Sequence, residues 1–268
     1  MVAIALLLSA ACYAGAAALA AVSLARAVVP PVRLVVAVLA AGVGAHLVAV
    51  GAAAHEAGHV SIMGLGPALS FAGLALAVTL LLAETLAKDT TLALAGAPLA
   101  AAATVSAAAV RDHVLAQPRG VQGAWLMAHI ALSFVGIAAL AVAAAAGTLY
   151  LVERRELKSR RFGRIFRAFP PLETLDRVNH MGAIIGCLGL TSGIGLAATY
   201  SLVYGQADGP RVVWGILAWL AASGVAGARL VGGWRARRAA VAATIAFGVT
   251  LVSYLAARMV AARPGQFL

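Results

Sequence analysis

The sequence is poor in charged and aromatic residues and contains only two cysteines. Charged residues make up 11% of its 268 positions and aromatic residues 6%, whereas 63% are hydrophobic. The mean hydropathy is +0.98. Because soluble domains carry about 25% charged residues, the composition excludes an ordinary soluble domain and indicates an integral membrane protein.

The cysteines and the excess of basic residues exclude several further classes. Cys12 and Cys187 lie far apart in apolar segments, so the sequence has no Cys-x-x-Cys redox pair, zinc ribbon or site for c-type haem attachment. The net charge of +11 comes from basic residues in short stretches between apolar segments, where membrane topology explains them. We therefore expect no nucleic acid partner.

Long uncharged segments predict an all-α fold. A hydrocarbon core about 30 Å thick requires roughly 20 apolar residues of helix, and such segments indicate a polytopic membrane protein. The predicted fold is a bundle of about eight transmembrane helices forming one membrane domain over residues 1–268. The predicted spans are Val2–Leu24, Leu34–Ala54, Ala68–Leu86, Thr90–Val110, Trp125–Val152, Gly182–Tyr204, Val212–Val231 and Ala239–Ala262.

The most basic stretch of the chain follows the fifth predicted span, and it sets the predicted orientation. Its basic residues are Arg154, Arg155, Lys158, Arg160, Arg161, Arg164 and Arg167. Lysine and arginine near helix ends favour the cytoplasmic side. This stretch is predicted as a cytoplasmic loop, and it can also contact anionic lipid. With this loop inside, a count of eight spans places both termini outside.

Histidines are the polar residues that this topology gathers at the outer half of the membrane. They are His46, His55, His59, His113 and His129, with His180 near the cytoplasmic side as the exception. Neutral imidazole is a good ligand for zinc, copper and haem iron. The alternative is that a histidine inside the membrane only hydrogen-bonds across helices. For His129, at the start of its span, both interpretations stay open.

The sequence HEAGH, from His55 to His59, matches the zinc-protease pattern H-E-x-x-H. On a helix this pattern places two imidazoles on one face, with Glu56 as general base. A catalytic zinc needs a third protein ligand, and Asp176 is predicted on the opposite side of the membrane. A membrane zinc metalloprotease is retained as an alternative function, with zinc as its cofactor.

Four segments together resemble the cytochrome c assembly family that includes CcsA, CcmC and HemX. They read WLMAH, LETLD, IGCLGLTSGI and GGWRARRAA, and they lie at Trp125–His129, Leu172–Asp176, Ile185–Ile194 and Gly232–Ala240. Their order and predicted topology agree with the family from about Leu34 onward. The HemX-like members are the most similar.

The resemblance implies a protein of the bacterial inner membrane that handles haem at the outer face for attachment to apocytochrome c. By this match His129 corresponds to the outward haem-liganding histidine, and His59 with Gly58 resembles a glycine-histidine pair of the family. Together with the shared depth of these histidines in the outer half of the membrane, the match predicts His129 as axial ligand, with His59 or His46 as the second ligand of the iron. Other cytochrome c assembly proteins and the tRNA-reducing enzyme of haem synthesis are implied as partners. Such a protein is an assembly factor rather than an enzyme.

The chain also departs from the family pattern. The tryptophan-rich signature expected after the sixth helix is absent, and the segment Tyr204–Trp214 reads YGQADGPRVVW instead. The histidine expected late in the seventh helix is missing near Gly227. These departures favour a further alternative, a degenerate scaffold subunit of a membrane complex that binds no cofactor.

Overall fold

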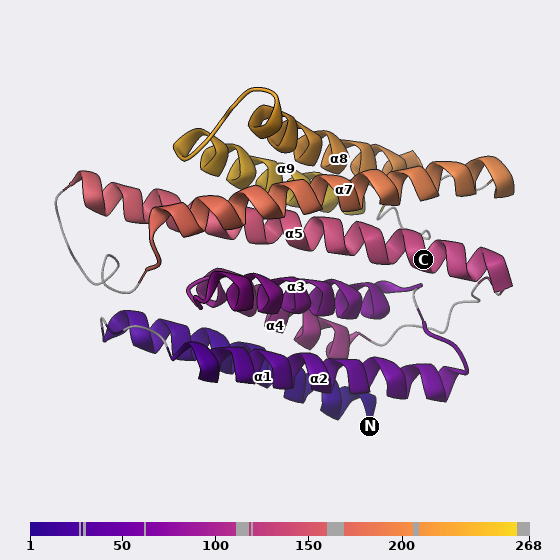
Figure 1. The fold of residues 1–268 in the computed structure, drawn as a ribbon. Helices are drawn as coiled ribbons and strands as arrows, with labels where there is room; N and C mark the ends of the chain where they lie inside the picture. Colours follow the sequence, from indigo (N-terminus) through magenta and orange to yellow (C-terminus); the bar gives the residue numbers. More distant parts are fainter. Residues whose placement is uncertain are drawn as a thin grey trace. The chain divides into compact units, whose positions relative to one another are not determined.

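The computed structural model describes residues 1–26, 28, 31–61, 63–110, 118, 120–159, 169–205 and 209–261. Within these ranges the chain is helical and contains no strand (Figure 1), which confirms the predicted all-α fold class. The helices are α1 (Val2–Ala25), α2 (Val32–Ala57), α3 (Leu65–Ala87), α4 (Ala93–Ala109), α5 (Gly120–Lys158), α7 (Leu172–Tyr204), α8 (Gly209–Leu230) and α9 (Arg237–Ala261).

Six of these helices are long and apolar enough to cross a membrane, namely α1, α2, α3, α5, α7 and α8. The helix α4 is apolar but has only 17 residues. A helix stands at each of the eight predicted spans, and the protein is a multi-pass membrane protein.

Two helices extend beyond their predicted spans. The helix α5 has 39 residues and continues to Lys158, so the prediction that the chain becomes a loop from Arg154 is wrong. The helix α7 begins at Leu172 rather than Gly182. Pro171 precedes it and Glu173 lies in its first turn, and proline and acidic residues favour a helix start.

The chain forms two compact units. Unit 1 comprises Met1–Gln117 and Leu149–Val178, and unit 2 comprises Pro118–Thr148 and Asn179–Leu268. The helices α5 and α7 each contribute residues to both units. The single membrane domain over residues 1–268 stays a prediction, and each unit is described separately below.

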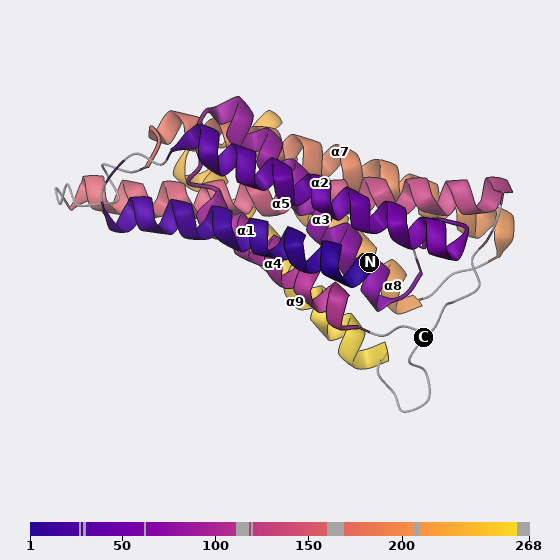
Figure 2. The ribbon, with the colours of Figure 1, turned by 90° about the horizontal axis from the view of Figure 1, so that it is seen from below.

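In unit 1, α1 packs against α2 and α4, and α3 packs against α2 and α4 (Figures 1 and 2). A polar contact joins three of these helices. The fully buried ring of His46 on α2 places Nδ1 3.3 Å from the Tyr13 hydroxyl of α1 and Nε2 2.9 Å from Ser70 Oγ of α3. Because lipid offers no hydrogen bonds, this contact satisfies a polar ring within the bundle.

Two acidic residues build the tight turn between α3 and α4. The buried Glu84 accepts a hydrogen bond at Oε1 from the Ala93 backbone N–H at 2.6 Å, at the first residue of α4. Asp89 Oδ1 accepts hydrogen bonds from the backbone N–H and the hydroxyl of Thr91, at 2.7 and 2.6 Å. Burial raises the pKa of Asp89. These contacts satisfy backbone and hydroxyl donors where α4 begins.

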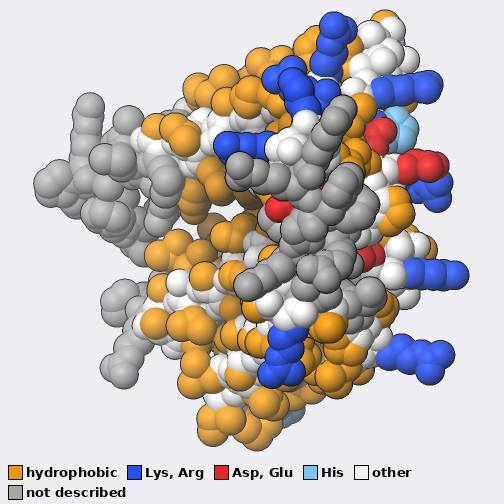
Figure 3. Space-filling view, turned by 90° about the vertical axis from the view of Figure 1, so that its left-hand side faces the viewer, with side chains coloured by type: hydrophobic (Ala, Val, Ile, Leu, Met, Phe, Trp, Pro, Cys, Tyr) orange, Lys and Arg blue, Asp and Glu red, His pale blue; other side chains and the backbone are white. Residues whose placement is uncertain are grey.

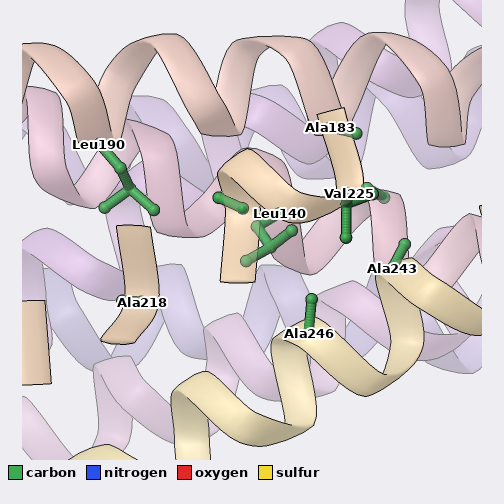
Figure 4. Packing of buried hydrophobic residues seen from close by; sticks show 9 residues of the cluster. Leu140, Ala183, Leu190, Ala218, Val225, Ala243 and Ala246 are labelled. Carbon is green, nitrogen blue, oxygen red and sulfur yellow. The ribbon is translucent and has the colours of Figure 1, made fainter. Parts of the chain in front are cut away.

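Unit 2 has a core of small and aliphatic side chains contributed by α5, α7, α8 and α9 (Figure 4). Leu140, Ala183, Ala218 and Ala243 are fully buried in it. Small residues let the backbones of membrane helices approach closely.

The helices α5 and α7 approach closely in unit 2, where glycine is required. A Cβ on Gly189 would lie 2.8 Å from the Cα of Gly136, and one on Gly193 would overlap the Ser133 hydroxyl. Because real Cβ atoms essentially never come this near to another heavy atom, a side chain at Gly189 would separate the two helices.

A buried polar pair joins three helices of unit 2 near the end of α8. Asn179 of α7 donates from Nδ2 to the Ala143 carbonyl of α5 at 2.6 Å, and its Oδ1 accepts from Arg229 of α8 at 2.8 Å. Both side chains are buried. The guanidinium is therefore held at the end of α8 by α7.

Within each unit, basic residues lie at one end of the helices, and Figure 3 views such ends. In unit 1, Arg26 follows α1, Arg33 lies in the first turn of α2, and Lys88 follows α3. In unit 2, Arg229 lies in the last turn of α8 and Arg237 begins α9. Arg160, Arg161, Arg164 and Arg167 lie outside the described residues, as does His113.

Replacing Gly189 with alanine is expected to destabilise unit 2, because the new methyl group meets the α5 backbone at Gly136. Overpacking of this kind costs about 1–3 kcal/mol. The matched control is Gly195→Ala, on the same helix with open space at its Cβ. Thermal unfolding in detergent should show a lower midpoint for Gly189→Ala alone, and equal midpoints would contradict the close contact.

Replacing His46 with alanine is expected to lower the stability of unit 1, since Tyr13 and Ser70 lose their buried partner. A buried group left unsatisfied costs about 1–3 kcal/mol. The exposed His55→Ala on the same helix serves as control. Thermal unfolding and resistance to proteolysis measure the effect. A His46→Ala protein as stable as the control would contradict a stabilising role for the hydrogen bonds of His46 to Tyr13 and Ser70.

Candidate functional site

The candidate site lies in unit 2 on one face of α5. Gln122, Trp125 and His129 are three and four residues apart in succession, a spacing that aligns their side chains along a helix. Each of them makes a hydrogen bond to α7. Gln122 Nε2 donates to the Tyr200 hydroxyl at 2.9 Å, Trp125 Nε1 to the Leu196 carbonyl at 3.1 Å, and His129 Nδ1 to the Gly193 carbonyl at 2.7 Å.

The bond to Gly193 determines the state of the His129 ring. A carbonyl oxygen only accepts hydrogen bonds, so Nδ1 carries a proton, and in a neutral imidazole the lone pair is then on Nε2. The structure gives Nε2 no hydrogen-bond partner among the described residues. A histidine whose Nδ1–H is held by a backbone carbonyl is the usual arrangement of a metal ligand, and His129 is half-buried rather than enclosed.

Three aromatic rings form a cluster nearer to the start of α5 than this histidine. Trp125 contacts Tyr200 and Tyr204 edge to face, with ring centroids 6.4 and 6.3 Å apart. The two tyrosine rings are 4.7 Å apart. Such rings bring a large apolar surface with polar groups at their edges, so the face combines one free imidazole nitrogen with an aromatic wall.

The two other predicted ligands belong to unit 1 and differ from each other. Both ring nitrogens of His46 are hydrogen-bonded, so a ligand role would require one of these bonds to break. His59 is half-buried, and its Nδ1 has no hydrogen-bond partner among the described residues. That either residue shares an iron with His129 stays a prediction.

The HEAGH segment does not form the geometry that the zinc interpretation requires. The helix α2 ends at Ala57, and Gly58 follows it with φ 74° in the left-handed region. His59 therefore lies beyond the helix, while His55 and Glu56 are exposed on it. Within the described ranges, no three or more His, Cys, Asp or Glu residues are grouped so that they could hold a metal ion.

Sequence reasoning missed Gln122, Tyr200 and Tyr204. Gln122 carried a usable signal, since it lies on the same helical face as Trp125 and His129. The tyrosines carried none, because they are more than 70 residues from their partners on α5 and only the packing of α7 brings them there.

Comparisons with known proteins agree with the motifs. The family model for cytochrome C assembly protein matches residues 2–262. The chain is 28% identical to the cytochrome c biogenesis protein CcsA of Synechococcus elongatus, over 75% of this chain and 76% of the relative. The CcsA protein of another Synechococcus strain matches with the same identity and coverage. Because the family model covers nearly the whole sequence, the chain belongs to the cytochrome c assembly protein family.

Proposed function

We propose that this protein handles haem during cytochrome c assembly, and that it binds haem at the outer face of the bacterial inner membrane with His129 as an axial ligand. The observation that carries the proposal is the His129 ring, whose Nδ1 is bonded to the Gly193 carbonyl while Nε2 stays available. Family membership supports a role in cytochrome c biogenesis.

The residues around His129 fit a haem. Its iron accepts an imidazole nitrogen as axial ligand, and the apolar macrocycle can pack against Trp125, Tyr200 and Tyr204. Haem is cargo in this proposal, and other assembly proteins and apocytochrome c receive it. Of the two histidines predicted as second ligand, His59 has a ring nitrogen without a partner among the described residues, whereas His46 uses both of its nitrogens within unit 1.

The distribution of charge supports the orientation. Basic residues mark the cytoplasmic side of membrane proteins, and they gather at one end of the helices within each unit (Figure 3). In unit 2, His129 lies toward the start of α5, the end opposite to Arg229 and Arg237 on their helices. In unit 1, His59 follows the end of α2, whose first turn contains Arg33. We therefore place both histidines, and both termini, outside.

Replacing His129 with alanine is expected to abolish the Soret band of the protein purified with haem, since the iron loses its ligand. Added imidazole should restore much of the band if the ring acts as a ligand and not only as a packing group. Optical spectra of the purified protein measure both effects.

The control for this experiment is His180→Ala, a half-buried histidine of the same unit on α7. It should leave the Soret band unchanged. A wild-type protein that copurifies with membrane partners but binds no haem would contradict the proposal and favour the scaffold function. Zinc bound in stoichiometric amount and lost on His55→Ala would favour the protease instead.

The orientation is tested by labelling single cysteines in intact cells with a reagent that does not cross membranes. In a background without Cys12 and Cys187, a cysteine at the exposed position His55 should be labelled, and one at the exposed Lys88 should be labelled only after lysis. Both residues belong to unit 1, and each lies at the C-terminal end of its helix, His55 on α2 and Lys88 after α3. Because α2 and α3 are consecutive spans, these two ends are expected on opposite sides of the membrane. The reverse pattern would contradict the proposed orientation.

A further inference from the structure

The hydrogen bond between Gln122 and Tyr200 leaves one donor unused. Gln122 Nε2 donates to the Tyr200 hydroxyl oxygen at 2.9 Å, so the hydroxyl keeps its own proton. The structure gives this proton no acceptor among the described residues. Tyr200 is 8% exposed, and a donor in such a place is best satisfied by an acceptor that approaches the face from outside.

The position of this donor relative to His129 is defined by the helix. Gln122 lies seven residues before His129 on α5, which corresponds to about 10 Å along the axis. In a haem, the iron lies at the centre and the two propionate carboxylates lie together at one edge, at a separation of the same order. A haem held by His129 and aligned with α5 therefore brings that edge to Gln122 and Tyr200.

The direction is also favourable. Gln122 lies closer than His129 to the start of α5, which the proposed orientation places at the outer surface. The charged propionates would then point toward water, and the apolar part of the macrocycle would lie deeper, beside Trp125. A carboxylate is costly to bury without hydrogen bonds, so a hydroxyl donor at this depth would stabilise a bound propionate.

We propose that Tyr200, oriented by Gln122, donates a hydrogen bond to a propionate of the haem bound at His129. This inference rests on the proposed function, and it adds that the site recognises the carboxylates of its ligand as well as its iron. Tyr200 binds the ligand directly. Gln122 is a positioning residue, because its amide nitrogen donates to the hydroxyl oxygen of Tyr200 and so fixes the hydroxyl.

The test compares two probes that differ only in the carboxylates. Ferric protoporphyrin IX and its dimethyl ester are titrated into the full-length protein in detergent, and the Soret band reports iron ligation in each case. The wild type should bind the free acid about tenfold to a hundredfold more tightly than the ester, because a hydrogen bond to a charged acceptor is stronger than one to a neutral group.

Tyr200→Phe should remove this preference by weakening the free acid alone, while the Soret band with the ester stays unchanged. Gln122→Leu should reduce the preference in the same sense but less. The matched control is Thr199→Val, which removes a hydroxyl of α7 that bonds to carbonyls of its own helix and should keep the full preference.

The outcomes separate the two proposals. A wild type that shows no Soret band with either probe overturns the proposed function, and this inference with it. A wild type that ligates both probes through His129 with equal affinity overturns this inference only. Equal weakening of acid and ester by Tyr200→Phe would assign the tyrosine to packing, which also overturns it.

Discussion

The contact between the backbones of α5 and α7 is the constraint on which the candidate site depends. Carbonyl oxygens of one membrane helix come within reach of side chains on another only when the helices approach closely, and at Gly136 and Gly189 the absence of side chains permits this. His129 can therefore bond to the carbonyl at Gly193. The orientation of the His129 ring therefore depends on the glycines of the contact between α5 and α7.

His46 and His129, both on apolar helices, differ in how their ring nitrogens are bonded. In lipid an unpaired polar group is costly, and His46 avoids this cost by bonding at both nitrogens, to Tyr13 and Ser70. His129 bonds at one nitrogen only. A histidine with two partners joins helices, whereas one with a fixed ring and a spare nitrogen is suited to bind something else.

The sequence predicted much of the fold because the long apolar segments and the basic residues at their ends are local signals. It predicted a long apolar helix at His129, but it could not distinguish His129 from His46, since their partners come from other helices. It also left HEAGH open. The left-handed Gly58 ends α2 between the two histidines, and a five-residue pattern does not show where its helix stops.

The chain lacks the family's tryptophan-rich loop, but the structure offers aromatic side chains on helices instead. A loop must be ordered before it presents a flat aromatic surface, whereas Trp125, Tyr200 and Tyr204 already lie on helices that pack through a glycine contact. Groups on rigid elements are held more closely in place than groups on loops. The aromatic surface at His129 therefore does not require the loop.

The geometry at position 129 also bears on the difference between a carrier and a scaffold. A scaffold needs only the bond across the helices, and the amide of a glutamine could donate to the Gly193 carbonyl as well as an imidazole does. What imidazole adds is a second nitrogen with a lone pair, on a half-buried ring of the helix that also carries Trp125. That nitrogen has no partner among the described residues, and in the proposed function it is the atom that would bind the iron.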